Sequence, residues 1–189
     1  MDPSTVIDLF QQSGALLEGH FKLSSGLHSS RYLQCALVLQ HPRHAELLGR
    51  ALADALRPYE PTVVLSPAMG GLIIGHEVGR ALGVRAVFSE RVDGVMTMRR
   101  GFTLEAGDRV VVIEDVLTTG KSTKETMVVV TAGGATVVAA GAIMDRSGGT
   151  ADLGVPFHVL SAVAVPAYSP EQCPMCAAGQ PVVKPGSRA

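Results

Sequence analysis

Residues Val111–Thr123 read VVIEDVLTTGKST. The apolar run before Glu114 is typical of a strand that is buried inside a sheet. A polar loop with one glycine follows the two carboxylates, and a helical pattern then runs from Thr119 to Ala132. A strand, a polar turn and a helix in this order predict a parallel sheet, in which ligands bind at the carboxyl ends of the strands.

A second segment of the chain shows the same order of strand, turn and helix. Thr62–Leu65 is a second apolar run, and a glycine-rich turn and a helical pattern from Gly70 to Leu82 follow it. Strands that alternate with helices predict an α/β fold with a central parallel sheet flanked by helices. The other predicted elements are a short amphipathic helix containing Val6 and Phe10, a β-rich stretch Leu16–Leu39, a helix at about Pro42–Leu56, a hairpin at Asp93-Gly94, and strands within Ala135–Met144 and Phe157–Val165.

Composition narrows the class of protein. The chain has 189 residues, of which 47% are hydrophobic and 17% charged, and its formal net charge is -1. This favours one globular core and argues against disorder, and it favours neither nucleic acid nor a membrane surface as a partner. Thr126–Met144 carries no charge, but Gly133-Gly134 interrupts it, so a helix end and a buried strand explain it better than a membrane span.

Two features point to the cytoplasm. The N-terminal residues lack the basic region and apolar core of a signal peptide. The chain has three cysteines, an odd and small number that does not resemble a secreted disulfide framework. We therefore expect a soluble protein in a reducing compartment.

Two nucleotide-binding motifs are excluded. Gly120-Lys121-Ser122 looks like the end of a P-loop, but a P-loop needs glycine five residues before Gly120, and that position is Asp115. A carboxylate there would repel the phosphates that the loop holds. The Rossmann fingerprint fails because Leu72 stands where its second glycine should be.

The acidic pair and the loop suggest a different ligand. Glu114 and Asp115 are poor partners for phosphate but good acceptors for the two hydroxyls of a ribose. Thr118–Ser122 supplies hydroxyls, a glycine and backbone N–H groups at a helix start, which favour a phosphate monoester. A ribose diol beside a 5-phosphate is one half of phosphoribosyl pyrophosphate.

This segment resembles the signature of the type I phosphoribosyltransferases, in which apolar residues and two acidic residues precede a Thr/Gly/Ser-rich phosphate loop. Further segments resemble the orotate-specific branch of that family, and together the resemblance covers about Leu16 to Val165. They are Phe21–Gly26 with Ser29 and Tyr32 (an N-terminal hood), Ser66–Gly71 (a pyrophosphate loop), Glu90-Arg91 with Met96–Phe102 (a mobile loop), and Asp145–Gly149 (a substrate-binding turn).

The resemblance implies one domain over residues 1–189 with the type I phosphoribosyltransferase fold. Its hood would comprise about residues 1–40 together with the C-terminal tail, and its core sheet about residues 60–165. The tail from Pro166 onward, which is rich in Pro and Gly, is expected to form an extended wrap. Homodimers with shared active sites are usual in the family.

The implied reaction transfers ribose 5-phosphate from phosphoribosyl pyrophosphate to orotate, releasing pyrophosphate, with Mg²⁺ held mainly by the substrate and no metal ligand from the chain. The implied catalytic residues are Glu114, Asp115, Arg99 and Arg100. The implied contacts to phosphoribosyl pyrophosphate are Gly70, Gly71, Arg91, Glu114, Asp115, Val116, Leu117, Thr118, Thr119, Gly120, Lys121 and Ser122. Those to orotate are Lys22, Ser25, Thr118 and Arg146.

Two departures from the family concern lysine. Many members carry one in the mobile loop, and some carry another in the pyrophosphate loop. The chain has none between Glu90 and Leu104, and Gly70 or Gly71 fills the second place. Arginine is not an equivalent point charge, so the sequence leaves open which residue replaces the lysine.

Several of these residues have a simpler interpretation. Arg99-Arg100 could be a solvated hairpin face, Lys22 an exposed strand lysine, and Arg146 a salt-bridge partner at a strand end. Cys173-Pro174-Met175-Cys176 has half the spacing of a zinc site, with no second CxxC and no nearby His. A surface pair of structural thiols is favoured there. None of the six histidines forms a pair with metal spacing.

Two other functions stay open. One is an enzyme of the same fold that acts on a purine or another base, which needs no arginine for a substrate carboxylate. The other is a regulator that senses phosphoribosyl pyrophosphate without catalysis. Such a regulator should carry a helix-turn-helix or a basic RNA-binding face, and the sequence shows neither.

Overall fold

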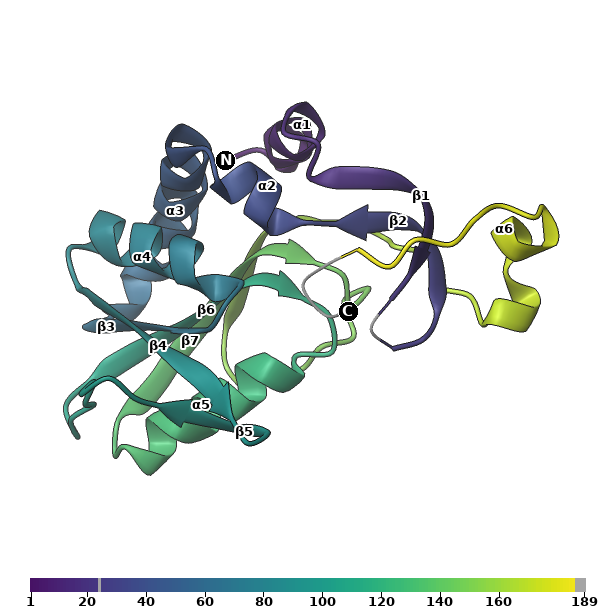
Figure 1. The fold of residues 1–189 in the computed structure, drawn as a ribbon. Helices are drawn as coiled ribbons and strands as arrows, with labels where there is room; N and C mark the ends of the chain where they lie inside the picture. The colour runs from purple at the N-terminus through teal and green to yellow at the C-terminus, as the bar shows by residue number, and fades with distance from the viewer. Residues whose placement is uncertain (24, 186–189) are drawn as a thin grey trace.

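A six-stranded sheet forms the centre of the computed structural model, which describes residues 1–23 and 25–185 (Figure 1). Its strand order is β5-β4-β3-β6-β7-β8, and every neighbouring pair is parallel except the edge pair β4–β5. The predicted central parallel sheet is confirmed. The strands are β3 (Val63–Pro67), β4 (Arg85–Val92), β5 (Val95–Met98), β6 (Arg109–Leu117), β7 (Thr136–Asp145) and β8 (Phe157–Ala162).

Helices cover both faces of this sheet, as Figure 1 shows: α3 (Pro42–Leu56) and α4 (Gly71–Leu82) lie on one side and α5 (Lys121–Ala132) on the other. Successive residues of a strand point to opposite faces, so the apolar run of β6 serves two cores. Val111 packs into the cluster that contains α3 and α4 residues, and Val112 into the cluster that contains Val130 of α5. Because both faces of β6 are buried, its apolar run is uninterrupted.

The two helices on the first face pack closely on the sheet and on each other. In α3, proline at the first position and buried residues every three or four positions account for a helix with the predicted bounds. In α4, Gly75 faces β3 so closely that a Cβ there would stand 1.8 Å from the Ser66 hydroxyl oxygen. Only glycine therefore permits this helix-to-strand distance.

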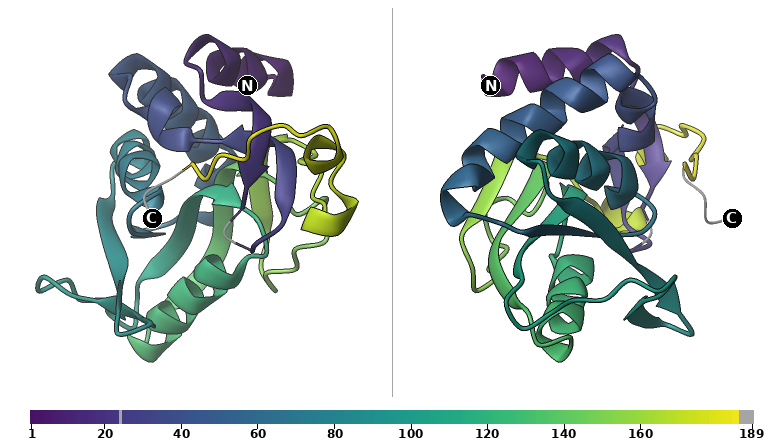
Figure 2. Two further views of the ribbon diagram at one scale, coloured as in Figure 1. Left: turned by 45° about the vertical axis from the view of Figure 1, so that its right-hand side comes forward. Right: turned by 90° about the vertical axis from the view of Figure 1, so that its left-hand side faces the viewer.

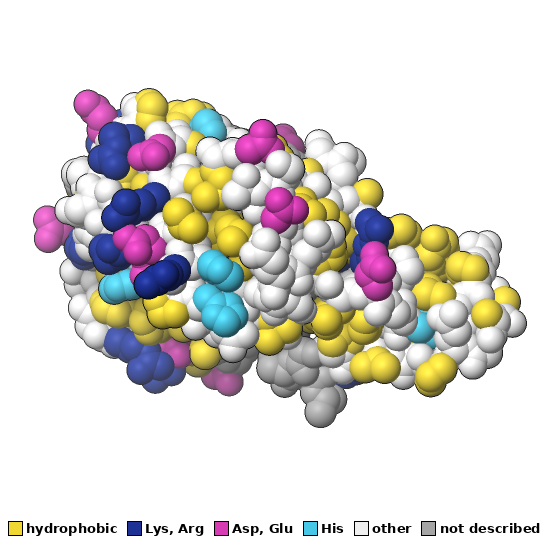
Figure 3. All heavy atoms as spheres, turned by 90° about the horizontal axis from the view of Figure 1, so that it is seen from above, with side chains coloured by type: hydrophobic (Ala, Val, Ile, Leu, Met, Phe, Trp, Pro, Cys, Tyr) yellow, Lys and Arg dark blue, Asp and Glu magenta, His cyan; other side chains and the backbone are white. Residues whose placement is uncertain are grey.

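Charges of both signs mingle on this helical layer, which Figure 3 views from above. Arg80 of α4 forms ion pairs with Glu77 and with Glu46 of α3, and Glu46 also pairs with Arg50. Arg50 and Arg80 are exposed and only Glu77 is largely covered, so each pair contributes little to the free energy of unfolding. They leave no single-sign patch on the face that the figure shows.

The N-terminal part adds a small hood. It consists of α1 (Pro3–Gln12), the antiparallel hairpin of β1 (Leu16–Lys22) and β2 (His28–Leu33), and the short helix α2 (Cys35–Leu39). α1 is anchored because Val6 and Phe10 lie in the same buried cluster as the sheet. The prediction of a β-rich stretch through Leu39 is wrong for Cys35–Leu39, because a short apolar run does not distinguish a strand from a buried helical turn.

The C-terminal segment runs beside the β1–β2 hairpin in every view (Figures 1 and 2). His28 and Tyr168 exchange two backbone hydrogen bonds of 2.8 Å, and Val183 bonds to the backbone of His20 and Lys22. Besides extended chain, this segment contains two short helices, so the predicted extended wrap is only part of it. Its helices are η2 (Pro170–Gln172) and α6 (Pro174–Ala177). Elsewhere in the chain, the short 3-10 helix η1 (Arg57–Tyr59) follows α3.

The predicted hairpin is present between β4 and β5. Val92 pairs with Val95 across the turn, and Asp93 and Gly94 both have positive φ, at 49° and 84°. Two positive φ angles suit a tight two-residue turn, which Asp-Gly favours. Among the described residues, no helix combines the length and apolar character needed to cross a bilayer.

Candidate active site at the carboxyl ends of β6 and β7

Two adjacent carboxylates lie in the second half of β6, which continues to Leu117 and so extends past the predicted strand end. Glu114 is buried and Asp115 partly buried. Asp115 accepts a 2.8 Å hydrogen bond from the Val116 N–H, which fixes one of its oxygens. Burial raises the pKa of both carboxyls, and for Glu114 the charge of Asp115 raises it further.

The polar loop follows these carboxylates directly. Thr118 and Thr119 are exposed, and Gly120 adopts a positive φ of 74° and caps α5. Lys121 begins that helix, so its first N–H groups are available to a ligand at the carboxyl edge of the sheet. Hydroxyls, backbone donors and a helix N-terminus in one loop have the chemistry that suits a phosphate group.

The loop between β3 and α4 lies against the same carboxylates. A Cβ built on Gly70 would stand 2.7 Å from both Asp115 carboxylate oxygens, and one on Gly71 would meet the Ile113 carbonyl oxygen at 2.9 Å. The Ala68–Met69 peptide bond in this loop is cis. The structure thus brings together the segments that the sequence analysis assigned to ribose and to pyrophosphate.

Arg146 lies at the end of β7, beside the loop Thr118–Ser122 that follows β6. Its backbone N–H donates a 2.8 Å hydrogen bond to the Leu117 carbonyl, which makes it a neighbour of Thr118. Its side chain is half-buried, and within the described residues its guanidinium joins no ion pair and its Nε has no hydrogen-bond partner. Burial lowers the pKa of Arg146, while Tyr32 and Cys35 act in the opposite direction. Among the described residues, Arg146 therefore does not act as a salt-bridge partner at the strand end.

Two hood residues border the site: Tyr32, which the sequence analysis named only as part of the hood segment, and Cys35, which it did not assign to the site. Tyr32 lies on β2 and, like Cys35 at the start of α2, is close enough to Arg146 to affect its pKa. Burial raises the pKa of the Cys35 thiol well above its usual range, and the charges of Asp115 and Glu114 add to this. The hood therefore closes one side of the site. The resemblance placed Tyr32 in the hood, but a lone cysteine such as Cys35 carries no sequence signal that could have indicated this.

Lys22 and Ser25 lie at the tip of the hood hairpin. Lys22 ends β1 and Ser25 lies in the turn that follows, and both side chains are exposed. The Lys22 backbone N–H donates to the Val183 carbonyl at 2.8 Å. Ser24, quoted with them in the hood segment, lies outside the described residues. A contact of Lys22 and Ser25 with a base stays a prediction.

The arginines of the β4–β5 region differ in their surroundings. Arg91 pairs with Glu125 of α5 and donates to the Gly94 carbonyl. Arg100 has a positive φ of 62°, pairs with Glu90 at 3.1 Å and stacks over the Phe88 ring at 5.5 Å. Arg99 is exposed and, in the part of the chain that the structure describes, forms no ion pair. A pyrophosphate would have to compete with carboxylates for two of these three side chains.

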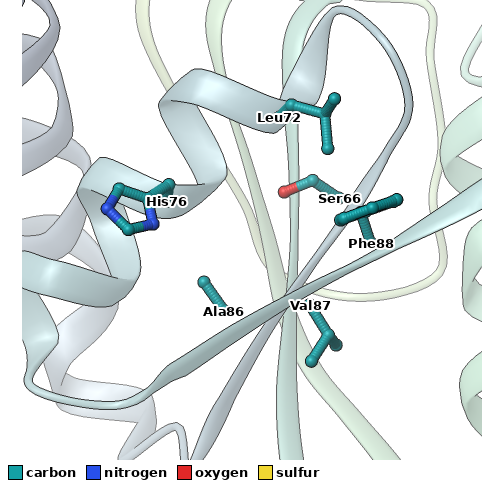
Figure 4. A pocket seen from close by; sticks show the side chains of 6 residues that line it. All are labelled: Ser66, Leu72, His76, Ala86, Val87 and Phe88. Atoms are coloured by element: carbon teal, nitrogen blue, oxygen red, sulfur yellow. The ribbon is translucent and has the colours of Figure 1, made fainter. Parts of the chain in front are cut away.

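A cavity of about 230 Å³ lies between α4 and the strands β3 and β4. Figure 4 shows Ser66 from β3, Leu72 and His76 from α4, and Phe88 from β4 around it. The Ser66 hydroxyl is buried with no hydrogen-bond partner within the described residues. Neither Glu114 nor Asp115 lines this cavity, so it is not the candidate active site.

The two C-terminal cysteines are not the isolated surface pair that the sequence suggested. Cys173 is buried and only Cys176 is exposed. No histidine is near them in the sequence, but His20 and His28 both contact them from the hood hairpin. These histidines are more than 140 positions away in the sequence, so no local spacing could have revealed them.

Comparison with known proteins identifies the family. The family profile described as phosphoribosyl transferase domain matches residues 36–161. The chain belongs to the phosphoribosyltransferase family. The matched region of this family member includes the β3–α4 loop, the acidic pair, the phosphate loop and Arg146, which are the segments that the fold brings to one edge of the sheet.

Relatives match the whole chain. An orotate phosphoribosyltransferase of Pelotomaculum thermopropionicum is 54% identical over 188 residues, covering 100% of this chain and 99% of that protein. An orotate phosphoribosyltransferase of Heliobacterium modesticaldum is 54% identical over 190 residues and covers 100% of both chains. Among solved structures, that of orotate phosphoribosyltransferase from Aeropyrum pernix has a TM-score of 0.72 at 23% identity, over 84% of this chain and 93% of that one. This last likeness shows the shared fold.

Proposed function

We propose that this phosphoribosyltransferase transfers ribose 5-phosphate from phosphoribosyl pyrophosphate to N1 of orotate, giving orotidine 5′-monophosphate and pyrophosphate. The observation that carries the choice of base is Arg146, a half-buried guanidinium without an ion pair in the described chain and beside the ribose-phosphate loop. Orotate differs from uracil by an ionised carboxylate, which such a group binds well. The names of the full-length relatives support the same substrate.

The acidic pair and the loop after it would hold the sugar phosphate. Glu114 and Asp115 accept hydrogen bonds from the two ribose hydroxyls, and the loop Thr118–Ser122 at the start of α5 holds the 5-phosphate. Val116 and Leu117 contribute backbone between the two groups. Gly70 and Gly71 bring the β3–α4 backbone close enough to Asp115 for the pyrophosphate to lie between the two loops.

The reaction then forms a bond from N1 of orotate to the anomeric carbon while the bond from that carbon to pyrophosphate breaks. The bonding pair leaves with pyrophosphate, and the N1 proton of orotate passes to solvent or to an oxygen of the departing pyrophosphate. Positive charge develops on the sugar ring as the bond breaks. Glu114 and Asp115 lie beside this ring, so their charge stabilises the transition state electrostatically. Thr118 is the first exposed residue after β6 and follows the Leu117 carbonyl to which Arg146 donates, so it would contact the base.

The donor atoms at this strand end fit the Mg²⁺ that the family generally uses with its sugar pyrophosphate. The chain offers carboxylate oxygens from Glu114 and Asp115 beside Gly70, and Mg²⁺ prefers oxygen ligands. Pyrophosphate and ribose oxygens would supply most of its ligands, with these carboxylates nearby. When bound, Mg²⁺ neutralises charge on the leaving pyrophosphate.

Arginines of the β4–β5 region would meet the pyrophosphate, in the family's manner across a homodimer. Arg99 is free to do so, while Arg91 and Arg100 must first exchange Glu125 and Glu90 for phosphate oxygens. Closing this hairpin over the sugar excludes water that would otherwise hydrolyse it. We place the reaction in the cytoplasm, where the free thiols of the chain stay reduced.

A panel of bases tests the proposal. Purified protein is incubated with phosphoribosyl pyrophosphate and Mg²⁺, and pyrophosphate release is followed with orotate, uracil, adenine, guanine and hypoxanthine. Release with orotate alone, together with orotidine 5′-monophosphate as product, is the expected result. Faster release with a purine would replace orotate by that base. Binding of phosphoribosyl pyrophosphate without turnover of any base would favour a sensing role.

A further inference from the structure

Four side chains that can ligate a metal converge outside the active site. His20 is on β1, His28 begins β2, and Cys173 and Cys176 flank the first turn of α6. One ligand atom from each of the four lies within 4.8 Å of all the others. His20, His28 and Cys173 are buried, and Cys176 is exposed. We call this group the His/Cys cluster.

Its distances are close to those of a tetrahedral zinc site. Zinc binds Cys sulfur at about 2.3 Å and His nitrogen at about 2.0–2.1 Å, so neighbouring ligand atoms are about 3.3–3.8 Å apart. The Cys173 and Cys176 sulfurs lie 3.5 and 3.6 Å from His20 Nε2, and Cys176 lies 3.2 Å from His28 Nδ1. The two imidazole nitrogens are 2.8 Å apart, so accommodating an ion would require them to separate by a few tenths of an ångström.

A second contact orients one of the imidazoles. His20 Nδ1 lies 2.9 Å from the Gln180 carbonyl oxygen, which can only accept a hydrogen bond. Nδ1 therefore carries the proton, and the lone pair of Nε2 faces the two sulfurs. Metal-binding histidines are typically held in this way, with the second ring nitrogen donating to a backbone carbonyl or carboxylate.

Backbone hydrogen bonds fix both halves of the His/Cys cluster. His28 exchanges two bonds with Tyr168, and Val183 bonds to the His20 carbonyl at 2.8 Å, so the C-terminal segment is held to the hairpin on either side of the cysteines. Within α6, the Ala177 N–H donates to the Cys173 carbonyl at 3.1 Å. This compact turn presents both thiols on one side, as the two-residue spacing of a zinc-binding CxxC requires.

We propose that His20, His28, Cys173 and Cys176 bind one Zn²⁺ ion in a closed structural site. Two thiolates and two imidazoles are ligands that zinc prefers, whereas Mg²⁺ prefers oxygen. Four protein ligands leave no open position for a substrate, so the ion has no direct part in the transfer reaction.

The ion would stabilise a part of the molecule that has little core of its own. A two-stranded hairpin is marginally stable unless something packs on it. Here a cross-link would join β1 and β2 to the C-terminal segment at the base of the turn that carries Lys22 and Ser25. Zinc therefore positions the tip of the hood, and the proposal holds whichever base the enzyme uses.

Elemental analysis of the full-length protein tests this proposal. Protein purified without added metal is expected to contain about one zinc per chain, and Cys173→Ser with Cys176→Ser is expected to lower this at least about tenfold. Cys35→Ala and His41→Gln are matched controls, a cysteine and an exposed histidine outside the cluster, and should keep the full content.

A second measurement uses the unaltered protein, in case the double variant does not fold. Zinc is removed with a chelator under reducing conditions, and Co²⁺ is added. The expected result is a stoichiometric cobalt complex with thiolate charge-transfer absorption and the intense visible bands of a tetrahedral ion, displaced by Zn²⁺. The melting temperature should fall on chelation and recover with zinc.

Three outcomes would overturn the proposal. Protein that binds less than about a tenth of an equivalent of zinc after incubation with Zn²⁺ holds a metal-free cluster, in which His28 Nδ1–H donates to His20 Nε2. A Cys173–Cys176 disulfide in protein kept under reducing conditions would also exclude the site. So would a cobalt spectrum typical of six oxygen and nitrogen ligands.

Discussion

Gly70 and Asp115 lie so close together that a methyl group on Gly70 would stand 2.7 Å from both carboxylate oxygens. Gly70 has φ -59°, an angle that any residue adopts, so its backbone does not require glycine. What requires glycine is the space beside the carboxylate. The β3–α4 loop and the β6 strand end are therefore coupled through this one contact.

Gly70→Ala should impair catalysis without unfolding the protein. The atoms that the new methyl group meets are at the end of a side chain, so Asp115 can rotate away at small cost. A displaced carboxylate no longer meets the ribose, and kcat/KM for phosphoribosyl pyrophosphate should fall at least about tenfold, or about 1.4 kcal/mol. Steady-state kinetics and thermal unfolding check this. Gly107→Ala, where the added group meets open space, is the control, and equal kinetics of both variants would contradict the coupling.

Asp115→Asn should keep the fold and lower kcat about a hundredfold, the usual cost of removing a group that stabilises transition-state charge. The amide oxygen of asparagine can still accept the hydrogen bond from the Val116 N–H, so local geometry is retained. Turnover at saturating substrates measures the effect. An unchanged kcat would sink the ribose-binding role of this residue.

The same variant should be more stable than the unaltered protein near neutral pH when substrate is absent. Burial raises the pKa of Glu114 and of Asp115 in the folded state. Their contribution to the free energy of unfolding is then fully present below their ordinary values of about 4 and is lost as pH rises through the raised values. Asp115→Asn removes one of these charges and, with it, the repulsion that Asp115 exerts on the Glu114 carboxylate. Denaturant unfolding at several pH values should show a difference that shrinks toward about pH 4, and a variant that is less stable at every pH would contradict it.

Much of this site follows from the sequence because its parts are local. Val111–Thr123 contains a strand, two carboxylates and a helix start in one continuous run, and the strand-helix pattern alone indicates that such runs meet at one edge of the sheet. The helix Pro42–Leu56 has the predicted bounds because proline and apolar spacing mark it clearly. The sequence pattern and the observed structure agree where the structure of a segment depends on that segment alone.

What the sequence did not reveal depends on distant pairs. His20 meets Cys173 across more than 150 positions, and Arg91 meets Glu125 on another element. Neither pair has any spacing signature, since the fold alone brings them together. Cys35–Leu39 was mistaken for extended chain because five apolar residues are too few to show a helical period.

The β4–β5 hairpin supplies another prediction. Arg99→Ala and Arg100→Ala should each lower turnover at least about tenfold if these side chains meet pyrophosphate in the closed state. Hydrogen exchange of residues 93–101 should be fast in the free protein and slow with substrates bound. Arg43→Ala, an exposed arginine on α3, is the control. Wild-type turnover in both hairpin variants would leave Arg99 and Arg100 as a solvated face.

The choice of base rests on Arg146, whose guanidinium is half-buried beside the ribose-phosphate loop and joins no ion pair within the described residues. A guanidinium can donate two parallel hydrogen bonds to a carboxylate, which the point charge of lysine does not reproduce. Arg146→Ala should therefore raise KM for orotate by the equivalent of about 2–4 kcal/mol, because the substrate carboxylate loses its partner in a partly desolvated place.

Arg146→Lys separates geometry from charge. It keeps the positive charge but not the paired donors, so its KM for orotate should fall between those of the alanine variant and the unaltered protein. The affinity for phosphoribosyl pyrophosphate should stay within about twofold in both variants, since the contacts that we propose for it lie away from the Arg146 side chain, on β6, α5 and the β3–α4 loop. Titrating each substrate against each variant decides the matter. Equal weakening of both substrates would make Arg146 a residue that supports the fold, and unchanged orotate kinetics would mean that another group recognises the base.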